Sequence, residues 1–166
     1  MRWADGWWSS SFLDQILPWL TYLGSHFAVI FFILLTWVLT KQRKILRHLV
    51  LLYAVQSAAI YGLKFLIQRQ RPLLVLEMAS KFSGGPGEIL DPTFPSAHTV
   101  LSFMMATLLT GWFPPYRVPF YLVAGWIGWT RIYLGVHYPT DVIAGGLLGY
   151  GITKVYSLYF ALSLKS

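Results

Sequence analysis

The sequence has no cysteine and few charged residues. Without cysteine, the chain can form no disulfide framework, no thiolate nucleophile and no zinc–thiolate site. Charged residues fill 11% of its 166 positions, whereas about 25% is usual in a soluble domain. Together with 56% hydrophobic residues and a mean hydropathy of +0.56, this deficit excludes a soluble globular domain, a disordered tail and a nucleic-acid-binding module.

Acidic residues are especially scarce: six Asp and Glu stand against thirteen Lys and Arg, which gives a net charge of +7. In a soluble chain this excess would indicate a nucleic-acid partner. In so apolar a chain, basic residues beside hydrophobic spans mark cytoplasmic loops or contacts with anionic lipid. We therefore expect one membrane domain over residues 1–166, in contact with the lipid bilayer, with neither nucleic acid nor an obligate protein partner.

Five apolar segments approach the length of about 20 residues that a membrane-spanning helix needs. They are residues 24–40, 48–67, 97–113, 118–134 and 142–162. The sequence predicts an all-α integral membrane bundle of five to six transmembrane helices, with the bundle over residues 24–162. The segment after Met1 lacks a basic start, a continuous apolar region and a small-residue cleavage site, so we expect no signal peptide.

Residues 1–23 form a different pattern. Trp7, Trp8 and further apolar residues recur at helical spacing, but Asp14 and Pro18 interrupt them. This pattern predicts an N-terminal amphipathic helix that lies at the membrane interface. A short, Pro-kinked sixth span is the alternative.

The orientation follows from the densest basic cluster, Lys41, Arg43, Lys44 and Arg47. By the positive-inside rule this cluster faces the cytoplasm. Counting spans from there places the loops 71–97 and 135–141 on the outer side. The most unusual polar residues of the chain then lie at one membrane face, where costly ionisable groups are functional candidates.

The first candidate cluster is Lys64 with Arg69 and Arg71-Pro72. Seven residues are about two helical turns, so we expect Lys64 and Arg71 to project from one helix face. Two such cations would clamp an anion such as phosphate. The alternative is a pair of snorkelling cations at a helix end. Pro72 is expected to end the helix.

The second candidate cluster, Ser96-Ala97-His98, directly precedes an apolar span. We expect the Ser96 hydroxyl to cap that helix. The free N–H groups and positive dipole end of a helix start form an anion site, which His98 in the first turn can reach. The alternative is a helix cap with an interfacial histidine.

The third candidate cluster contains Arg131, His137 and Asp141. A carboxylate four residues after a histidine can accept a hydrogen bond from one imidazole nitrogen and orient the other. That is the arrangement of a base or nucleophile with its orienting group. The alternative is a structural His–Asp pair at a helix cap.

Taken together, the three clusters resemble the three-part signature of the type 2 phosphatidic acid phosphatase superfamily. The matching segments are Lys64-x6-Arg71-Pro72, Pro95-Ser96-Ala97-His98 and Arg131-x5-His137-x3-Asp141. Two positions depart from the signature. Ala97 replaces a glycine but keeps its backbone N–H, and Thr130 replaces a serine but keeps a hydroxyl.

The resemblance implies a mechanism. His137 would be the nucleophile that forms a phosphohistidine, and Asp141 would hold its other nitrogen. His98 would protonate the leaving oxygen and then activate water. The residues that would bind the phosphoryl oxygens are the three cations and two further donors: Lys64, Arg71, Arg131, Ser96 and Ala97. Because cations would neutralise the phosphate and no cluster of acids could hold magnesium, neither a metal nor a cofactor is expected.

The implied substrate is a membrane lipid with a terminal phosphate. Phosphatidylglycerol phosphate, undecaprenyl pyrophosphate, phosphatidate and the 1-phosphate of lipid A all remain open. The expected location is a bacterial inner membrane, with the site on the periplasmic or extracellular side. A lipid phosphotransferase and a non-catalytic anionic-lipid binder or transporter are the alternatives.

A few residues outside the signature also carry expectations. Arg69 and Lys81 are expected to be solvated surface charges rather than ligands of a second phosphate. Gly145, Gly146 and Gly149 are expected to permit close helix packing. His26 and His48 receive no role.

Overall fold

The structure is a computed structural model that describes residues 11–75 and 91–163. Within these ranges the chain forms helices and no strand, which confirms the predicted all-α class there. The elements are α1 (Ser11–Leu20), the 3-10 helix η1 (Thr21–Gly24), α2 (His26–Thr40), α3 (Arg43–Ile67), α4 (Pro72–Val75), α6 (Ala97–Trp112), the 3-10 helix η2 (Pro114–Tyr116), α7 (Arg117–Tyr133) and α8 (Pro139–Ser163).

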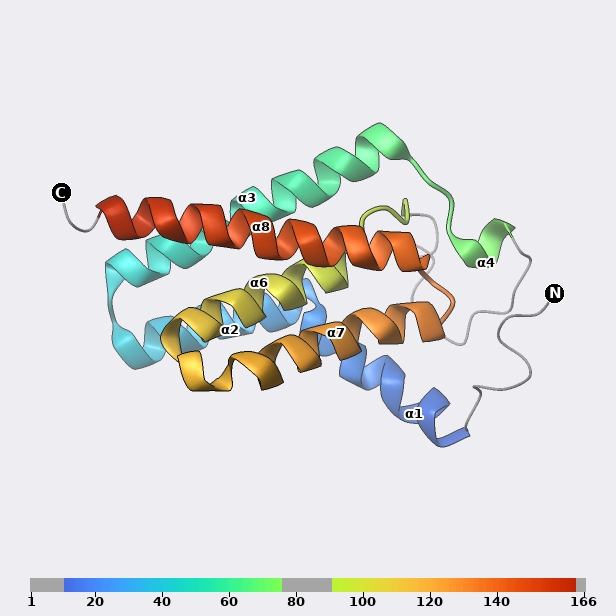
Figure 1. Cartoon of the computed structure of the whole chain (residues 1–166), viewed down its shortest axis with the longest axis horizontal. Helices are drawn as coiled ribbons and strands as arrows, with labels where there is room; N and C mark the ends of the chain where they lie inside the picture. The colour runs from blue at the N-terminus through green and yellow to red at the C-terminus, as the bar shows by residue number, and fades with distance from the viewer. Residues whose placement is uncertain (1–10, 76–90, 164–166) are drawn as a thin grey trace.

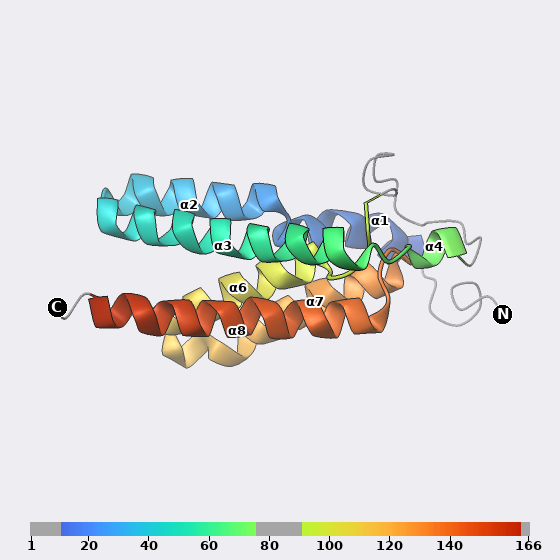
Figure 2. The same cartoon turned by 90° about the horizontal axis from the view of Figure 1, so that it is seen from above.

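The long helices run along the long axis of an elongated bundle (Figure 1). Seen from above, α2 and α3 lie side by side in one layer, and α6, α7 and α8 lie on the other side (Figure 2). Helix α6 packs against both α7 and α8. The short helices α1 and α4 lie at one end of the bundle, and α8 ends at the other (Figure 1).

Each of the five predicted spans coincides with a helix. Helix α3 begins at Arg43, five residues before the predicted span, because Lys41 adopts a left-handed conformation (φ 54°) and the turn after α2 is complete by Gln42. By length and apolar composition, the described stretch Arg43–Val75 is long enough to cross a membrane. The helical stretches Phe12–Gly24 and His26–Thr40 are long and apolar enough to cross a membrane only when they are taken together. They are bent by 51° relative to each other.

The N-terminal helix α1 is attached to the bundle by a polar contact. The Tyr133 hydroxyl donates a hydrogen bond to Asp14 Oδ1 at 2.7 Å, and Leu17 is fully buried. Phe12 and Trp19 on the same helix are 66% and 76% exposed. The predicted Trp7 and Trp8 anchors lie outside the described residues.

The apolar side chains divide between a core and an outer surface. The core joins α2, α3 and α6 through residues such as Val29, Leu52 and Leu101. Large apolar side chains also cover the outside of the bundle, for example Phe27 at 81% and Phe65 at 75% exposed. So much exposed apolar surface is not usual for a soluble monomer and fits a surrounding of lipid.

Glycines bring α8 against α6, as predicted. A Cβ atom at Gly149 would lie 2.2 Å from the Val100 carbonyl oxygen, and one at Gly145 would lie 2.9 Å from that of Ser96. These distances leave no room for a side chain. The close contact holds the start of α6 beside the start of α8.

This contact predicts that Gly149→Ala destabilises the protein by about 1–3 kcal/mol, because the added methyl group must displace the backbone of α6. The measurement is thermal unfolding in detergent, followed by circular dichroism. The matched control is Gly151→Ala on the same helix, where a Cβ meets nothing within 4 Å. Equal melting temperatures for the two variants would contradict the close-packing argument.

Candidate active site

The three predicted clusters meet at the end of the bundle that carries α1 and α4 (Figure 1). They surround a cavity of about 160 Å³. Its lining comes from α2, α3 and α6 and from the segments after α3, before α6 and after α7: His26, Tyr61, Lys64, Arg71, Asp91, Ala97, His98, Leu101 and His137. Four parts of the chain that lie far apart in the sequence therefore contribute to one site: residues 26, 61–71, 91–101 and 137.

Lys64 and Arg71 converge on a single carboxylate. Lys64 Nζ lies 2.7 Å from Asp91 Oδ2 and also donates to the Pro92 carbonyl. Arg71 Nη2 lies 3.7 Å from the same carboxylate oxygen, and its Nε donates to the Asp91 carbonyl at 2.9 Å. The two basic side chains are only 5% and 3% exposed, so they form a buried cationic site.

The expected geometry of this pair is wrong in one respect. Lys64 and Arg71 do not share a helix face, because α3 ends at Ile67. Gln68 adopts a left-handed conformation (φ 47°), and its N–H donates to the Lys64 carbonyl. Pro72 begins α4 rather than ending α3. The two cations still reach one point, because the chain turns back after α3.

Asp91 is a site residue that the sequence did not reveal. Its side chain is 37% exposed and pairs with both cations. The only sequence signal is the rarity of acids in this chain. The carboxylate offsets part of the positive charge of Lys64 and Arg71.

His137 and Asp141 come together through a third residue. His137 Nδ1 lies 3.7 Å from Asp141 Oδ2, beyond hydrogen-bond distance. The Thr93 hydroxyl fills the gap, 2.9 Å from His137 Nδ1 and 2.7 Å from Asp141 Oδ2. Thr93 is fully buried, and nothing in its local sequence pattern indicated this role.

The bridge fixes the tautomer of His137. A carboxylate only accepts hydrogen bonds, so the single hydroxyl proton of Thr93 goes to Asp141. The Thr93 oxygen then accepts from His137 Nδ1–H. In the neutral ring this leaves Nε2 without a proton, with its lone pair available for nucleophilic attack.

The charge state of His137 agrees with this role. The pKa of His137 is lowered to about 3, chiefly by burial and also by the positive charges of Arg131 and Arg71, against the opposing effect of Asp141. Because the folded-state pKa lies below the ordinary value, the imidazole stays neutral from neutral pH down to about 3. His137 is therefore uncharged at physiological pH.

Asp141 itself is completely buried and accepts several hydrogen bonds. Besides Thr93, the Tyr138 N–H donates to Oδ2 at 2.9 Å, and Arg69 Nη1 donates to Oδ1 at 2.9 Å. The Arg69 guanidinium also stacks over the Tyr138 ring at 3.9 Å. Arg69 is 38% exposed, as expected for a surface charge, but it also pairs with the buried carboxylate, which the sequence did not predict. Lys81 lies outside the described residues.

The start of α6 carries Ser96, Ala97 and His98. Ser96 occupies the N-cap position, but its side chain makes no capping hydrogen bond. The predicted hydroxyl cap is wrong, because Ser96 Oγ instead accepts from the Thr99 hydroxyl at 2.9 Å. The Ser96 N–H donates to the Asp141 carbonyl at 3.2 Å. Ala97 and His98 line the cavity, as the helix-start argument requires.

Arg131 lies behind the cavity rather than in its described lining. Its side chain is fully buried, and Nη1 donates to the Thr21 hydroxyl at 3.2 Å. Its carbonyl accepts from the His137 N–H at 3.2 Å. Arg131 therefore supports the loop that carries His137 and contributes positive charge close to its ring.

His26 is a further site residue, after Asp91 and Thr93, that the sequence did not assign. It lines the cavity from α2, with Nδ1 2.8 Å from the Tyr53 hydroxyl and Nε2 3.3 Å from that of Tyr61. Its ring stacks on Tyr61. The predicted membrane orientation could have indicated His26. It places the start of the first span on the same side of the membrane as the other site residues.

No group of three or more His, Asp or Glu residues able to hold a metal occurs in the described ranges. The charged groups that face the cavity are two cations and one carboxylate. Such a set suits a phosphate anion. Three histidines on the same cavity, His26, His98 and His137, add groups that can react and transfer protons.

Comparison with known proteins agrees with this chemistry. The family model of the PAP2 superfamily matches residues 45–164. The chain belongs to the PAP2 superfamily. Its relatives include the lipid A 1-phosphatase of Rhizobium johnstonii, 45% identical over 84 residues, which cover 48% of this chain and 34% of that protein. The putative undecaprenyl-diphosphatase YbjG of Escherichia coli is 30% identical over 118 residues, which are 70% of this chain and 58% of that protein.

The crystal structure of Aquifex aeolicus LpxE has the same arrangement of helices. It superposes with a TM-score of 0.78 at 26% identity, over 96% of this chain and 100% of that chain. The match to the lipid A 1-phosphatase spans only about a third of that protein's length. The structural similarity, by contrast, extends over nearly the whole of this chain.

The Thr93 bridge predicts that Thr93→Val lowers kcat for phosphate release about 100-fold, because His137 loses the partner that fixes its orientation. KM is expected to change little, since Lys64 and Arg71 remain in place. Thr93→Ser keeps the hydroxyl and is expected to retain activity near that of the wild type. A Thr93→Ser variant as slow as Thr93→Val would contradict the bridge.

The ion pairs of Asp91 with Lys64 and Arg71 predict that its carboxylate competes with phosphate for these two cations. Asp91→Asn is expected to lower the inhibition constant of orthophosphate about fivefold, because the two cations lose their competing anion. Asp14→Asn, which makes the same charge change on α1, is the control and is expected to leave this constant unchanged. An inhibition constant that rises in Asp91→Asn would show that Asp91 assists phosphate binding.

Proposed function

We propose that this protein is an integral-membrane lipid phosphatase that removes the terminal phosphate of a lipid phosphate or pyrophosphate through a phosphohistidine intermediate. One observation carries the proposal. The Asp141–Thr93–His137 chain leaves Nε2 of His137 without a proton, and His137 lines a cavity together with Lys64, Arg71 and His98. Membership of the PAP2 superfamily supports the same chemistry.

In the first step, His137 Nε2 attacks phosphorus, and the bond from phosphorus to the lipid oxygen breaks. Lys64 and Arg71 neutralise the phosphoryl oxygens, and His98 donates a proton to the leaving oxygen. The proposal assigns further donors to Ser96 and the Ala97 N–H, and a supporting charge to Arg131. The helix start of α6 favours negative charge at this position.

In the second step, His98 removes a proton from water. The water oxygen attacks phosphorus, the phosphorus–nitrogen bond breaks, and inorganic phosphate leaves. His137 returns to its starting tautomer, because the Thr93–Asp141 pair again holds Nδ1–H. Each group thus ends the cycle in the protonation state in which it began.

The membrane placement belongs to the same proposal. The five long helices span the bilayer, with α1 at the interface or as part of a bent sixth span. Exposed Phe12 and Trp19 on α1 support interfacial anchoring. The basic residues between α2 and α3 face the cytoplasm, so the cavity opens on the periplasmic side of a bacterial inner membrane. Residues 1–166 act as one domain.

The proposed substrate is a lipid that brings a terminal phosphate to the headgroup level. Relatives named for lipid A and undecaprenyl diphosphate support this class. Phosphatidylglycerol phosphate and phosphatidate are the remaining candidates within it. The cavity of about 160 Å³ accommodates a phosphate group and leaves the lipid body outside.

The proposal predicts that the purified protein in detergent releases phosphate from at least one of four lipids. They are phosphatidylglycerol phosphate, undecaprenyl pyrophosphate, phosphatidate and lipid A 1-phosphate. We expect the rate to be unchanged by EDTA and to fall at least about 1000-fold in His137→Ala, because no phosphohistidine can form. Acid-labile phosphate on the wild-type protein would mark the intermediate.

The control for folding is the melting temperature of His137→Ala, which is expected to stay close to that of the wild type. Wild-type turnover in His137→Ala would overturn the mechanism. Transfer of phosphate to a lipid acceptor, with no inorganic phosphate released, would identify a phosphotransferase instead. Binding of the four lipids without turnover would identify a non-catalytic binder.

A further inference from the structure

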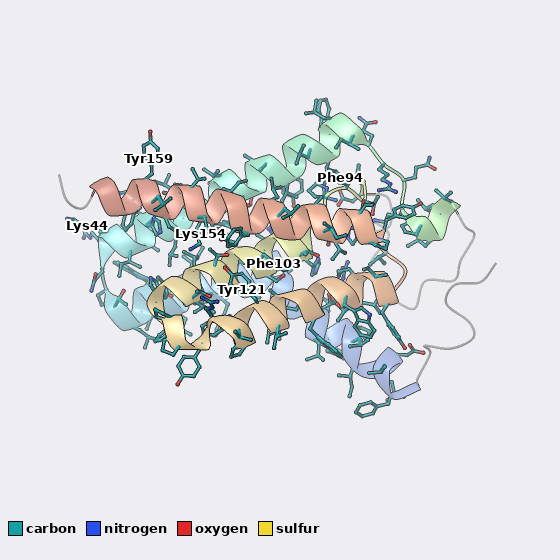
Figure 3. All side chains as sticks on the ribbon, viewed as in Figure 1. Lys44, Phe94, Phe103, Tyr121, Lys154 and Tyr159 are labelled. Carbon is teal, nitrogen blue, oxygen red and sulfur yellow. The ribbon has the colours of Figure 1, made fainter. Side chains whose placement is uncertain are left out.

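A second cavity lies at the end of the bundle opposite the candidate active site. It has a volume of about 390 Å³ between the start of α3 and the end of α8. Figure 3 shows Lys44 and Tyr159 at this end and Phe94 at the other. Lys44, Arg47 and His48 line the cavity from α3, and Tyr156, Tyr159 and Phe160 line it from α8.

The α3 side of the cavity carries positive charge and a buried histidine. His48 is only 7% exposed, and its Nδ1 has no hydrogen-bond partner in the part of the chain that the structure describes. Its ring stacks on those of Tyr156 and Phe160, with centroids 4.9 and 3.8 Å away. A buried polar atom without a partner is costly. A ligand with a polar group at this place would satisfy it.

An apolar groove continues from this cavity along the same two helices. It has a volume of about 420 Å³ and shares Tyr156 and Tyr159 with the cationic cavity. Its other walls are apolar, with Val55 from α3 and Ile152 and Val155 from α8. A Cβ atom at Gly151 would meet nothing within 4 Å, so the groove has open space at this position.

We propose that the cationic cavity and the apolar groove together bind one anionic phospholipid. Its phosphate lies at Lys44, Arg47 and His48, and an acyl chain lies against Val55 and Val155. Lys44 and Val55 are eleven residues apart on α3, which corresponds to about 16 Å along the helix. That length is about half of a bilayer core, as expected for one chain of one leaflet.

The composition of the site selects an amphiphile rather than a free anion. A solvated basic patch would explain Lys44 and Arg47 but not the buried His48 or the adjoining apolar groove. A hydrocarbon site would explain the groove but not the cations. Juxtamembrane basic residues attract anionic headgroups at the cytoplasmic surface.

This site is separate from the catalytic cavity. His48 and Lys64 are sixteen residues apart on α3, which corresponds to about 24 Å. A lipid bound here does not reach His137 and is not turned over. It bridges α3 and α8, which meet farther along at Gln56, whose Nε2 donates to Gly149 and Thr153. The bound lipid therefore stabilises α8, the helix that carries Asp141 in its first turn.

The first test measures binding to the purified full chain in an uncharged detergent, by native mass spectrometry and thermal unfolding. Dioleoyl phosphatidylglycerol is expected to bind one to one and to raise the melting temperature. Dioleoyl phosphatidylcholine is expected to bind at least about tenfold more weakly. Equal binding of the two lipids, or equal protection by inorganic phosphate at the same concentration, overturns the proposal.

The second test changes the cations. Arg47→Gln is expected to weaken phosphatidylglycerol binding about fivefold, and Lys44→Gln/Arg47→Gln at least about twentyfold. The matched control is Arg43→Gln, an exposed position on the same turn that does not line the cavity. Unchanged binding in the double variant would place the lipid elsewhere, including at the active site, and overturns the proposal.

The third test fills the groove. Gly151→Leu is expected to reduce phosphatidylglycerol binding at least about tenfold, while the melting temperature without lipid stays at or above that of the wild type, since leucine favours a helix. Gly125→Leu, at an open position on α7, is the control and is expected to bind as the wild type does. Normal binding in Gly151→Leu overturns the assignment of the acyl chain. These readouts use no turnover and are independent of the proposed phosphatase activity.

Discussion

The buried carboxylate of Asp141 is the constraint on which the site depends. Burying a charged carboxylate is costly unless hydrogen bonds replace its water. Here the replacements are Arg69 from the segment after α3, Thr93 from the segment before α6, and the Tyr138 N–H from the turn before α8. Three distant segments must converge to satisfy one group, so the same contacts that stabilise Asp141 also place His137.

The backbone reinforces this convergence. Gly145 and Gly149 let α8 approach α6 more closely than any side chain would allow. The Ser96 N–H then reaches the Asp141 carbonyl, so the starts of the two helices are joined by a direct hydrogen bond. Because His98 follows one helix start and His137 precedes the other, packing between α6 and α8 brings both histidines to one cavity.

The sequence allowed the helices and the meeting of the three clusters to be predicted, because apolar length and the spacing of charges are local signals. Thr93, Asp91, His26 and the pairing of Arg69 could not be predicted in this way. Thr93 and Asp141 are 48 residues apart, and their contact leaves no periodic pattern. The helix-face argument for Lys64 and Arg71 failed for a local reason, the left-handed conformation of Gln68, which residue spacing does not encode.

Burial separates the two functions of positive charge in this chain. Lys44 and Arg47 are exposed and keep their water, so they need no internal partner. Lys64 and Arg71 have lost almost all contact with water and therefore require an anion nearby. Asp91 supplies one negative charge against their two, which leaves this part of the cavity with an excess of one positive charge. A phosphate monoester carries two negative charges and so balances the two cations better than Asp91 does. The ion pairs with Asp91 therefore hold Lys64 and Arg71 in place but leave one of their two positive charges unbalanced.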